Sequence, residues 1–271
     1  MQSPPLRLSE KCAWGALGLV GFLGLWAALS AFGIVPRQFL PSPLDVLTRF
    51  VHLLTNPFAG ATLPQHLASS FERYAYGVLL AAFIGVPLGL LMGWFRWLDD
   101  IVTPIFDGLR FIAPIAWVPF AALWFGVGIG GPILIIFAGA FPPCLINAYR
   151  GARFVEPRLI EAARMLGTGH LRMILEILLP AATPSIVSGL RVSAGLGWQS
   201  LVGAELIVAA AGVGFMMVQA QANVATPTVM AGMVAIGLVG MTLAVAWQVF
   251  GRYVLNSTPT WTEALSIQLM G

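Results

Sequence analysis

Six long apolar segments dominate this sequence and limit what it can fold into. Each approaches or exceeds the roughly 20 residues that an α-helix needs to cross the hydrocarbon of a bilayer. Continuous apolar runs of this length favour helices, because the strands of a membrane β-barrel alternate apolar and polar residues. We therefore predict an all-α integral membrane protein with six transmembrane helices, at residues 13–32, 70–94, 101–127, 131–149, 183–208 and 229–254.

The composition argues against several classes of function. Only 9% of the 271 residues are charged, whereas soluble proteins carry about a quarter. The formal net charge of +3 comes from scattered arginines rather than a basic tail, so we expect no nucleic-acid binding. The two cysteines and three histidines lie far apart in the sequence and predict neither a disulfide framework nor a metal site. A Gly-rich lysine motif for phosphate is missing, so we expect no cofactor on this chain, and ATP must bind elsewhere.

The distribution of Lys and Arg predicts the orientation, because cytoplasmic loops carry an excess of these residues. With the N-terminus and the segment around Glu161 placed inside, nine basic residues lie on the inner side and three on the outer side. The inner ones are Arg7, Lys11, Arg96, Arg150, Arg153, Arg158, Arg164, Arg172 and Arg252, and the outer ones are Arg37, Arg49 and Arg73. We therefore predict that both termini are cytoplasmic.

This topology divides the chain into three parts. Residues 1–69 comprise an N-terminal cytoplasmic segment, the first transmembrane helix and a periplasmic connector. Residues 70–255 form the core, with short cytoplasmic helices predicted at 157–180, and residues 256–271 form a C-terminal cytoplasmic tail. The first apolar segment shows no small-residue cleavage site, so we expect a retained anchor rather than a signal peptide.

Two features within this frame have a structural and a functional interpretation. The Pro-rich connector, with a short helix predicted from Ser42 through Leu54, is either a simple connection or part of a docking rim for an outside partner. Gly85, Gly89 and Gly93 recur every four residues and so share one helix face. Such a face allows two helices to pack closely, and the alternative is a face that slides during a conformational cycle.

The interval around Glu161 is a patterned polar segment between two apolar blocks. Pro157 suits the first position of a helix, where its missing N–H would be unpaired anyway, and Gly167 predicts where that helix ends. The apolar stripe at i, i+4 and i+7 consists of Leu159, Ala163 and Leu166. Charged residues that can pair on another face are Arg158, Glu161 and Arg164.

A second helix is predicted after the glycine break, with Thr168 as its cap. Its apolar stripe comprises Leu171, Ile174, Leu175 and Leu178, and Pro180 and Pro184 punctuate the entry to the next span. The small side chains of Ala162 and Ala163 favour a surface that another protein approaches closely. The alternative is an amphipathic hairpin that lies on the lipid.

These residues resemble the EAA signature of ATP-binding-cassette importer permeases. The resemblance comprises Glu161-Ala162-Ala163, then Gly167, then Ile177-x-Leu179-Pro180, at the family's spacing. Three further stretches are similar to the branch that imports sulfonates, taurine and nitrate, namely FLPSPLDVL at 39–47, PIAWVPFAALWFGVG at 114–128 and GWQSLVGAEL at 197–206.

The resemblance implies a type I importer permease fold in the bacterial inner membrane. It further implies that the chain works as a dimer, with two cytoplasmic ATPase subunits that bind ATP and Mg and a periplasmic binding protein that delivers the substrate. The coupling element would consist of Glu161, Ala162, Ala163 and Gly167, and the chain itself would perform no bond chemistry. The implied cargo is a small anion of the sulfonate, taurine or nitrate type, and the alternative within the class is a vitamin or a pyrimidine precursor.

A rival class is a membrane-embedded enzyme or a passive channel. An enzyme should show clustered His, Asp or Glu at membrane depth, whereas the charges of this chain are nearly isolated there. A channel would not need ATPase subunits, so co-purification with such a subunit separates the two.

Polar residues inside the predicted spans are candidates for the translocation path, because charge at membrane depth is costly and usually functional. In the fifth span one helix face holds Arg191, Gly195, Trp198, Val202 and Glu205, with Gln199 at its edge. One interpretation is that this stripe lines the translocation path. The other is that the stripe is structural, so that Glu205 pairs with groups of the outer loops and Arg191 extends its side chain toward the cytoplasmic surface. An anionic substrate would be repelled by Glu205 unless this group is paired. Asn147 in the fourth span is a further candidate.

Overall fold

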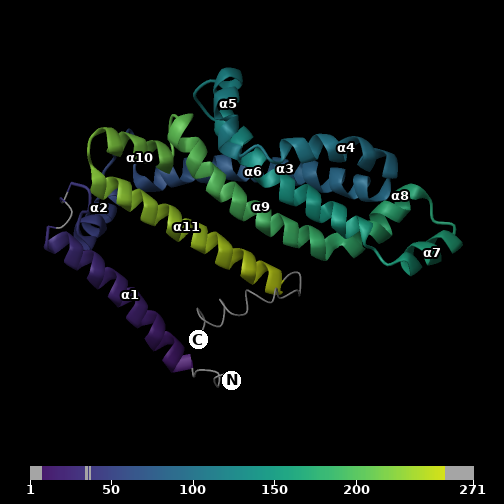
Figure 1. The fold of residues 1–271 in the computed structure, drawn as a ribbon, viewed down its shortest axis with the longest axis horizontal. Helices are drawn as coiled ribbons and strands as arrows, with labels where there is room; N and C mark the ends of the chain where they lie inside the picture. Colours follow the sequence, from purple (N-terminus) through teal and green to yellow (C-terminus); the bar gives the residue numbers. More distant parts are fainter. Residues whose placement is uncertain (1–7, 34–35, 37, 254–271) are drawn as a thin grey trace. The chain divides into compact units, whose positions relative to one another are not determined.

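The computed structural model describes residues 8–33, 36 and 38–253 and is built from helices (Figure 1). The chain folds into two compact units, one comprising 1–62 and 217–271 and the other 63–216. The predicted cytoplasmic tail at 256–271 and the first seven residues of the N-terminal segment lie outside the described residues.

Three long helices form the core of the second unit: α3 (Leu63–Trp94), α6 (Gly130–Arg153) and α9 (Leu179–Ile207). Helix α6 packs extensively on both α3 and α9. A Cβ on Gly89 would lie 2.5 Å from the carbonyl oxygen of Leu145, and a Cβ on Gly93 would lie 2.5 Å from Ala152 Cβ. The glycine face of α3 therefore permits close packing against α6, as its four-residue spacing predicted.

The predicted third span is broken rather than continuous. Helix α4 (Arg96–Leu109) is followed by a short 3₁₀ helix, η1 (Pro114–Trp117), and by α5 (Val118–Phe125), with a bend of 88° between the two parts. Ala113 adopts an extended backbone (φ −56°, ψ 139°), because the ring of Pro114 disfavours the α conformation in the residue before it. The prediction of one continuous helix over 101–127 was therefore wrong.

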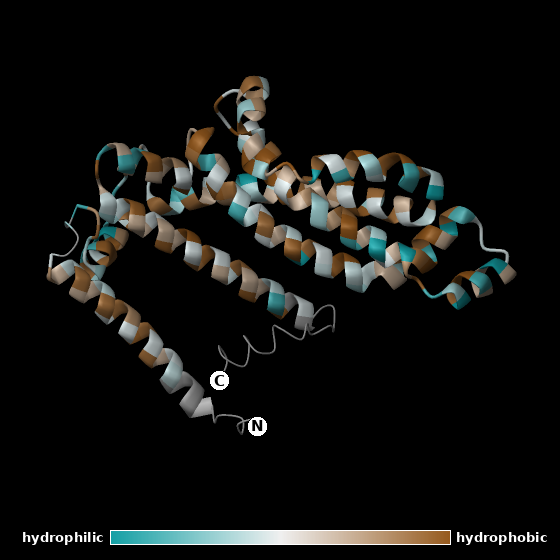
Figure 2. Cartoon of the chain, in the orientation of Figure 1, coloured by the Kyte–Doolittle hydropathy of each residue, from teal (hydrophilic) through white to brown (hydrophobic). Residues whose placement is uncertain are grey.

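Five described helices are long and apolar enough to span a membrane, or six spans if the bent pair counts as one. The five are 14–31, 63–94, 130–153, 170–207 and 226–249. Hydrophobic residues run along α11 (Thr226–Tyr253), whereas hydrophilic residues gather on α7 (Pro157–Met165) (Figure 2). These findings agree with the predicted all-α architecture of about six spans.

The first unit contains α1 (Leu8–Ala31), α2 (Pro43–Thr55) and α11, and α10 (Val213–Ala222) straddles the boundary between the units. Helix α2 confirms the short helix predicted in the connector. Ser42 and Asp45 form a capping box at its start, which satisfies two backbone N–H groups. Arg49 Nε donates to Thr228 Oγ1 at 2.8 Å and so ties α2 to α11.

Candidate functional site

Helix α7 and the turn that follows it carry the predicted coupling residues, and α7 is anchored to the core by one side only. Pro157 is its first residue, as predicted. Ala163 is 5% exposed, and Ile160 packs against a buried cluster that includes Ala152, Val155 and Leu178. Because Ile160 and Ala163 are three residues apart, they share a face, and α7 packs on the segment Met173–Leu178 that precedes α9.

The C-terminal end of α7 has the geometry that its glycine predicted. Gly167 has φ +74°, its N–H donates to Arg164 O at 3.0 Å, and the Thr168 N–H donates to Ala163 O at 3.1 Å. These two bonds form a Schellman motif, in which the left-handed residue is usually glycine. A Cβ at Gly167 would meet no neighbouring atom, so backbone conformation rather than space selects glycine here.

The outward side of α7 is exposed and carries apolar side chains among charged ones. The predicted stripe divides, because Ala163 turns inward whereas Leu159 and Leu166 turn outward; Leu166 and Met165 are each 85% exposed. Glu161 and Ala162 are also exposed. Arg158 lies 3.9 Å from Glu156 rather than against Glu161, and an exposed pair of this kind contributes little to stability. The face therefore suits burial against another protein.

The segment after Gly167 differs from the prediction of a separate capped helix. Gly169, not Thr168, is the N-cap of α8 (His170–Arg172), which continues through a π-helical segment, η2 (Met173–Leu178), into α9. Pro180 is tolerated within this continuous helix because the π-helical turns just before it depart from the i→i−4 pattern that its missing N–H would interrupt.

The predicted second stripe does not lie on one face. Leu178 is buried and Ile174 partly buried, whereas Leu171 and Leu175 are exposed. The π-helical segment accounts for this difference, because i→i+5 bonding changes the rotation per residue on which the stripe was based.

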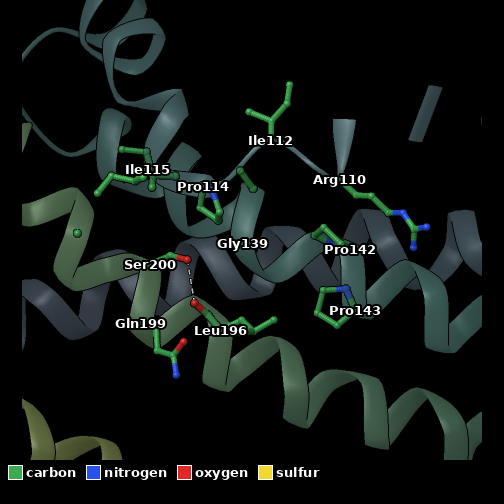
Figure 3. Close-up of a pocket in the computed structure, with 13 residues that line it drawn as sticks. Arg110, Ile112, Pro114, Ile115, Gly139, Pro142, Pro143, Leu196, Gln199 and Ser200 are labelled. Atoms are coloured by element: carbon green, nitrogen blue, oxygen red, sulfur yellow. Dashed lines mark hydrogen bonds between the residues drawn. The ribbon is translucent and has the colours of Figure 1, made fainter. Parts of the chain in front are cut away.

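A cavity of about 390 Å³ lies where the α4–α5 break meets α6 and α9 (Figure 3). This volume is within the roughly 300–1,000 Å³ typical of small-molecule pockets. It is lined by Arg110, Ile112, Pro114, Ile115, Ile135, Ala138, Gly139, Pro142, Pro143, Leu196, Gln199, Ser200 and Gly203. All of these lining residues are described, and of them only Arg110 is charged.

Arg110 is held in place by three neighbours. Its Nε lies 2.9 Å from Asp107 Oδ1, with the two side chains 37% and 47% exposed. Its guanidinium carbon lies 5.1 Å from the ring centroid of Phe111 and 5.9 Å from that of Phe106. These distances are within the range of cation–π attraction, so the guanidinium is restrained from two sides.

The predicted path residues are distributed over different surroundings. Gln199 lines the cavity. Asn147 is partly buried on α6 and donates to Pro143 O at 2.9 Å; neither it nor the partly buried Arg191 is among the lining residues. The side of α9 that faces the cavity holds Leu196, Gln199, Ser200 and Gly203. This side lies next to the predicted stripe, because three of these residues directly follow the stripe residues Gly195, Trp198 and Val202 in the sequence.

Glu205 lies in a buried network that joins α3, α9 and the loop before α10. It is 2% exposed, pairs with Arg73 at 2.9 Å, and accepts hydrogen bonds from Ser70 Oγ at 2.8 Å and the Gly214 N–H at 3.0 Å. Arg73 also donates to Ala211 O at 2.6 Å. The carboxylate is thus paired, as the structural interpretation of the stripe expected, and its cation comes from α3.

The sequence reasoning missed Arg110, Pro142 and Pro143 as lining residues. The Pro114 break could have indicated this place, because irregular backbone at membrane depth is tolerated only where protein or a water-filled cavity surrounds it. The pairing of Arg73 with Glu205 had no comparable signal, since 132 residues separate the two.

Comparison with known proteins gives consistent results. Residues 85–257 match the family model described as "Binding-protein-dependent transport system inner membrane component". The chain is 33% identical over 249 residues to the taurine transport system permease protein TauC of Escherichia coli, which covers 92% of this chain and 90% of the relative.

Two further relatives have similar identity. The putative aliphatic sulfonates transport permease protein SsuC of Bacillus subtilis is 35% identical, over 80% of this chain and 78% of its own. The bicarbonate transport system permease protein CmpB of Synechococcus elongatus is 35% identical, over 89% and 88%. Among solved structures, the inward-facing MetNI methionine ABC transporter matches with a TM-score of 0.54 at 22% identity, covering 68% of this chain and 95% of that one. This last likeness shows the type I importer permease fold.

Proposed function

The chain belongs to the family of binding-protein-dependent transport system inner membrane components, and from this premise we propose that it forms the translocation path for a small anion of the sulfonate, taurine or nitrate type. Members of this family are transporter subunits, not enzymes. Membership also implies a multi-pass inner-membrane protein that associates with ATPase and substrate-binding partners.

The proposed assembly contains two copies of this chain. Each copy offers one α7 helix, so an importer driven by two ATPase subunits needs two permease subunits. ATP and Mg bind to the ATPase subunits, both termini of the permease are cytoplasmic, and the binding protein approaches from the periplasm. The excess of basic residues on the α7 side supports this orientation.

The observation that carries the proposal is the two-sided character of α7. Its inner face is fixed to the core by Ile160 and Ala163, while its outer face exposes Leu166 and Met165. An ATPase that binds the outer face moves the core with it, because α8, η2 and α9 form one continuous helix from α7 to the cavity. Glu161, Ala162, Ala163 and Gly167 are the coupling residues in this proposal, with Gln199 on the path.

Three relatives support the substrate class. Their names refer to taurine, aliphatic sulfonates and bicarbonate, each of which carries an anionic group. Selectivity in such importers also depends on the binding protein, so the class rather than one compound is proposed.

The test is uptake by the reconstituted complex. The chain, its ATPase and its binding protein are placed in proteoliposomes, and ATP-dependent uptake of labelled taurine, an alkanesulfonate, nitrate and bicarbonate is measured beside a pyrimidine. Uptake of one or more of the anions is expected. Uptake of the pyrimidine alone, or anion uptake that proceeds without ATP, would contradict the proposal.

A further inference from the structure

We infer that helix α2 lies in the membrane–water interface, with one apolar face inserted among the lipids of the leaflet at the C-terminal end of α1. In the proposed orientation this is the periplasmic leaflet. The inference goes beyond the proposed function and does not depend on the cargo. It gives the connector a third role, because a face that is covered by lipid is not part of a docking rim for an outside partner.

Helix α2 has an apolar face that is exposed. Successive residues of an α-helix are turned by about 100°, so residues at i, i+3, i+7 and i+10 lie along one face. In α2 these positions form the leucine face, which consists of Leu44, Leu47, Val51 and Leu54, and all four side chains are exposed. A separate, polar side of the helix exposes Asp45, Thr48 and His52. This division is typical of a helix at a lipid surface.

A third side of α2 packs on protein. Val46 and Leu53 are buried, and α2 packs on α11. Arg49 donates to Thr228, the third residue of α11, and the apolar stretch of that helix begins at Thr226. The contact with α11 therefore leaves the leucine face exposed, and it places α2 level with one end of a membrane span.

Hydrogen bonds to α1 place α2 at the same depth. Trp26 Nε1 donates to Pro41 O at 3.0 Å, and Ser30 Oγ donates to Leu40 O at 3.1 Å. Both donors belong to the last two turns of the apolar stretch 14–31 of α1. Figure 1 shows α2 beside the end of α1 and the start of α11. Two spans thus independently place α2 where the hydrocarbon meets the headgroups.

The depth and the composition of the leucine face both favour lipid over protein. At the end of a span, an amphipathic helix buries its apolar face among headgroups and acyl chains. Leu and Val are under-represented among the side chains that dominate protein interfaces, whereas Trp, Tyr and Arg are enriched there. A protein that approaches from the aqueous phase would meet Asp45, Thr48 and His52 instead.

The test compares spin labels on the two exposed sides of α2. Cys12→Ser and Cys144→Ala remove the native thiols, and this parent chain must still assemble with its ATPase subunit. Leu47→Cys and Val51→Cys then place a nitroxide on the leucine face. The matched controls on the polar side are Thr48→Cys and His52→Cys. All four side chains are exposed, so a label displaces no packed residue.

The measurement is power-saturation EPR of the labelled complex in nanodiscs of phosphatidylethanolamine and phosphatidylglycerol. Oxygen concentrates in lipid, whereas the complex of nickel with ethylenediaminediacetate stays in water. Labels on the leucine face should be more accessible to oxygen than to nickel, at a depth of about 5–10 Å below the headgroups. Labels on the polar side should show the reverse order. The measurement is made without the binding protein and again with it.

Each other occupant gives its own result. Accessibility of the leucine face to nickel would overturn the inference, and loss of that accessibility when the binding protein is added would identify the binding protein as the occupant. Inaccessibility to both reagents in both measurements would indicate a second copy of this chain and would also overturn the inference. Leu44→Cys and Leu54→Cys replace any variant that fails to assemble. None of these results depends on the transported solute, so failure of the proposed function is a separate outcome.

Discussion

Two glutamates of this chain lie in opposite surroundings. Glu161 sits on the exposed surface of α7 and takes part in none of the described hydrogen bonds or ion pairs. Glu205, near the far end of the continuous helix that follows α7, is 2% exposed and engages Arg73, Ser70 and Gly214. One carboxylate is available to a partner, and the other has its partners already.

This difference shows how to interpret charge in a membrane protein. A charge at membrane depth is as compatible with a structural network as with a path, and its bonding decides between the two. An exposed charge with small neighbours, such as Glu161 beside Ala162, suggests a binding surface. Substitutions in the buried network and on α7 test this contrast.

The largest effect is expected at the buried network. Arg73→Leu leaves the Glu205 carboxylate buried without its cation, and loss of one partner from a buried pair costs about 3–5 kcal/mol of stability. Thermal unfolding of the detergent-purified protein measures this loss. The double variant Arg73→Leu with Glu205→Leu should regain part of it, since no unpaired charge remains.

Glu161→Leu is the exposed counterpart of this experiment. Its stability should change by no more than about 0.5 kcal/mol, as is usual for surface substitutions. Equal destabilisation at the two sites would contradict the contrast between the buried and the exposed glutamate.

An intermediate effect is expected at the end of α7. Gly167→Val forces a β-branched residue to φ +74°, which costs at least about 1–2 kcal/mol in the left-handed region and unravels this helix end. Uptake should be lost while the amount of protein in the membrane fraction stays normal. The control is Gly169→Val, because Gly169 has φ −72° and open space around its Cα. Normal uptake in Gly167→Val would show that the Schellman turn has no part in coupling.

The smallest effect on stability is expected on the outer face of α7. Leu166 is 85% exposed, so Leu166→Ser should leave the unfolding temperature nearly unchanged. Binding of the ATPase subunit, titrated in detergent, should weaken by about fivefold or more, because a side chain that anchors an interface contributes over about 1 kcal/mol. Leu123→Ser on α5, where Leu123 is equally exposed, should leave ATPase binding intact. Equal binding in both variants would remove α7 as the docking surface.

The features that the sequence predicted well depend on neighbours in the chain. Helix α7 begins at Pro157 and ends before Gly167 because each of these residues has its own backbone preference. Helix α2 begins at a local capping box formed by Ser42 and Asp45. The four-residue glycine spacing predicted a face for close helix packing for the same reason, since helical geometry alone puts those residues on one face; that the partner is α6 came from the structure.

The features that the sequence could not predict depend on contacts between distant residues or on the rotation of a helix about its own axis. Arg73 and Glu205 meet only after α3 and α9 have packed. The side of α9 that faces the cavity is shifted from the predicted stripe to Gln199 and Ser200, because the packing of α9 on α6 and not its own composition sets that orientation. The lining of the cavity by Arg110 required knowledge of the 88° bend.

The π-helical segment between Met173 and Leu178 has a consequence for how insertions and deletions are tolerated. A π-helical turn holds one residue more than the α-helical turn it replaces, and each residue of an α-helix advances the chain by about 100°. Removing a single residue there would restore uninterrupted α-helix and turn the residues before it by about that angle around the axis of α9. Helix α7 packs on this segment, with Ile160 against the buried cluster that includes Leu178, so the turn would break that packing. One residue of surplus length therefore keeps the start of the long helix in register with the surface on which α7 rests.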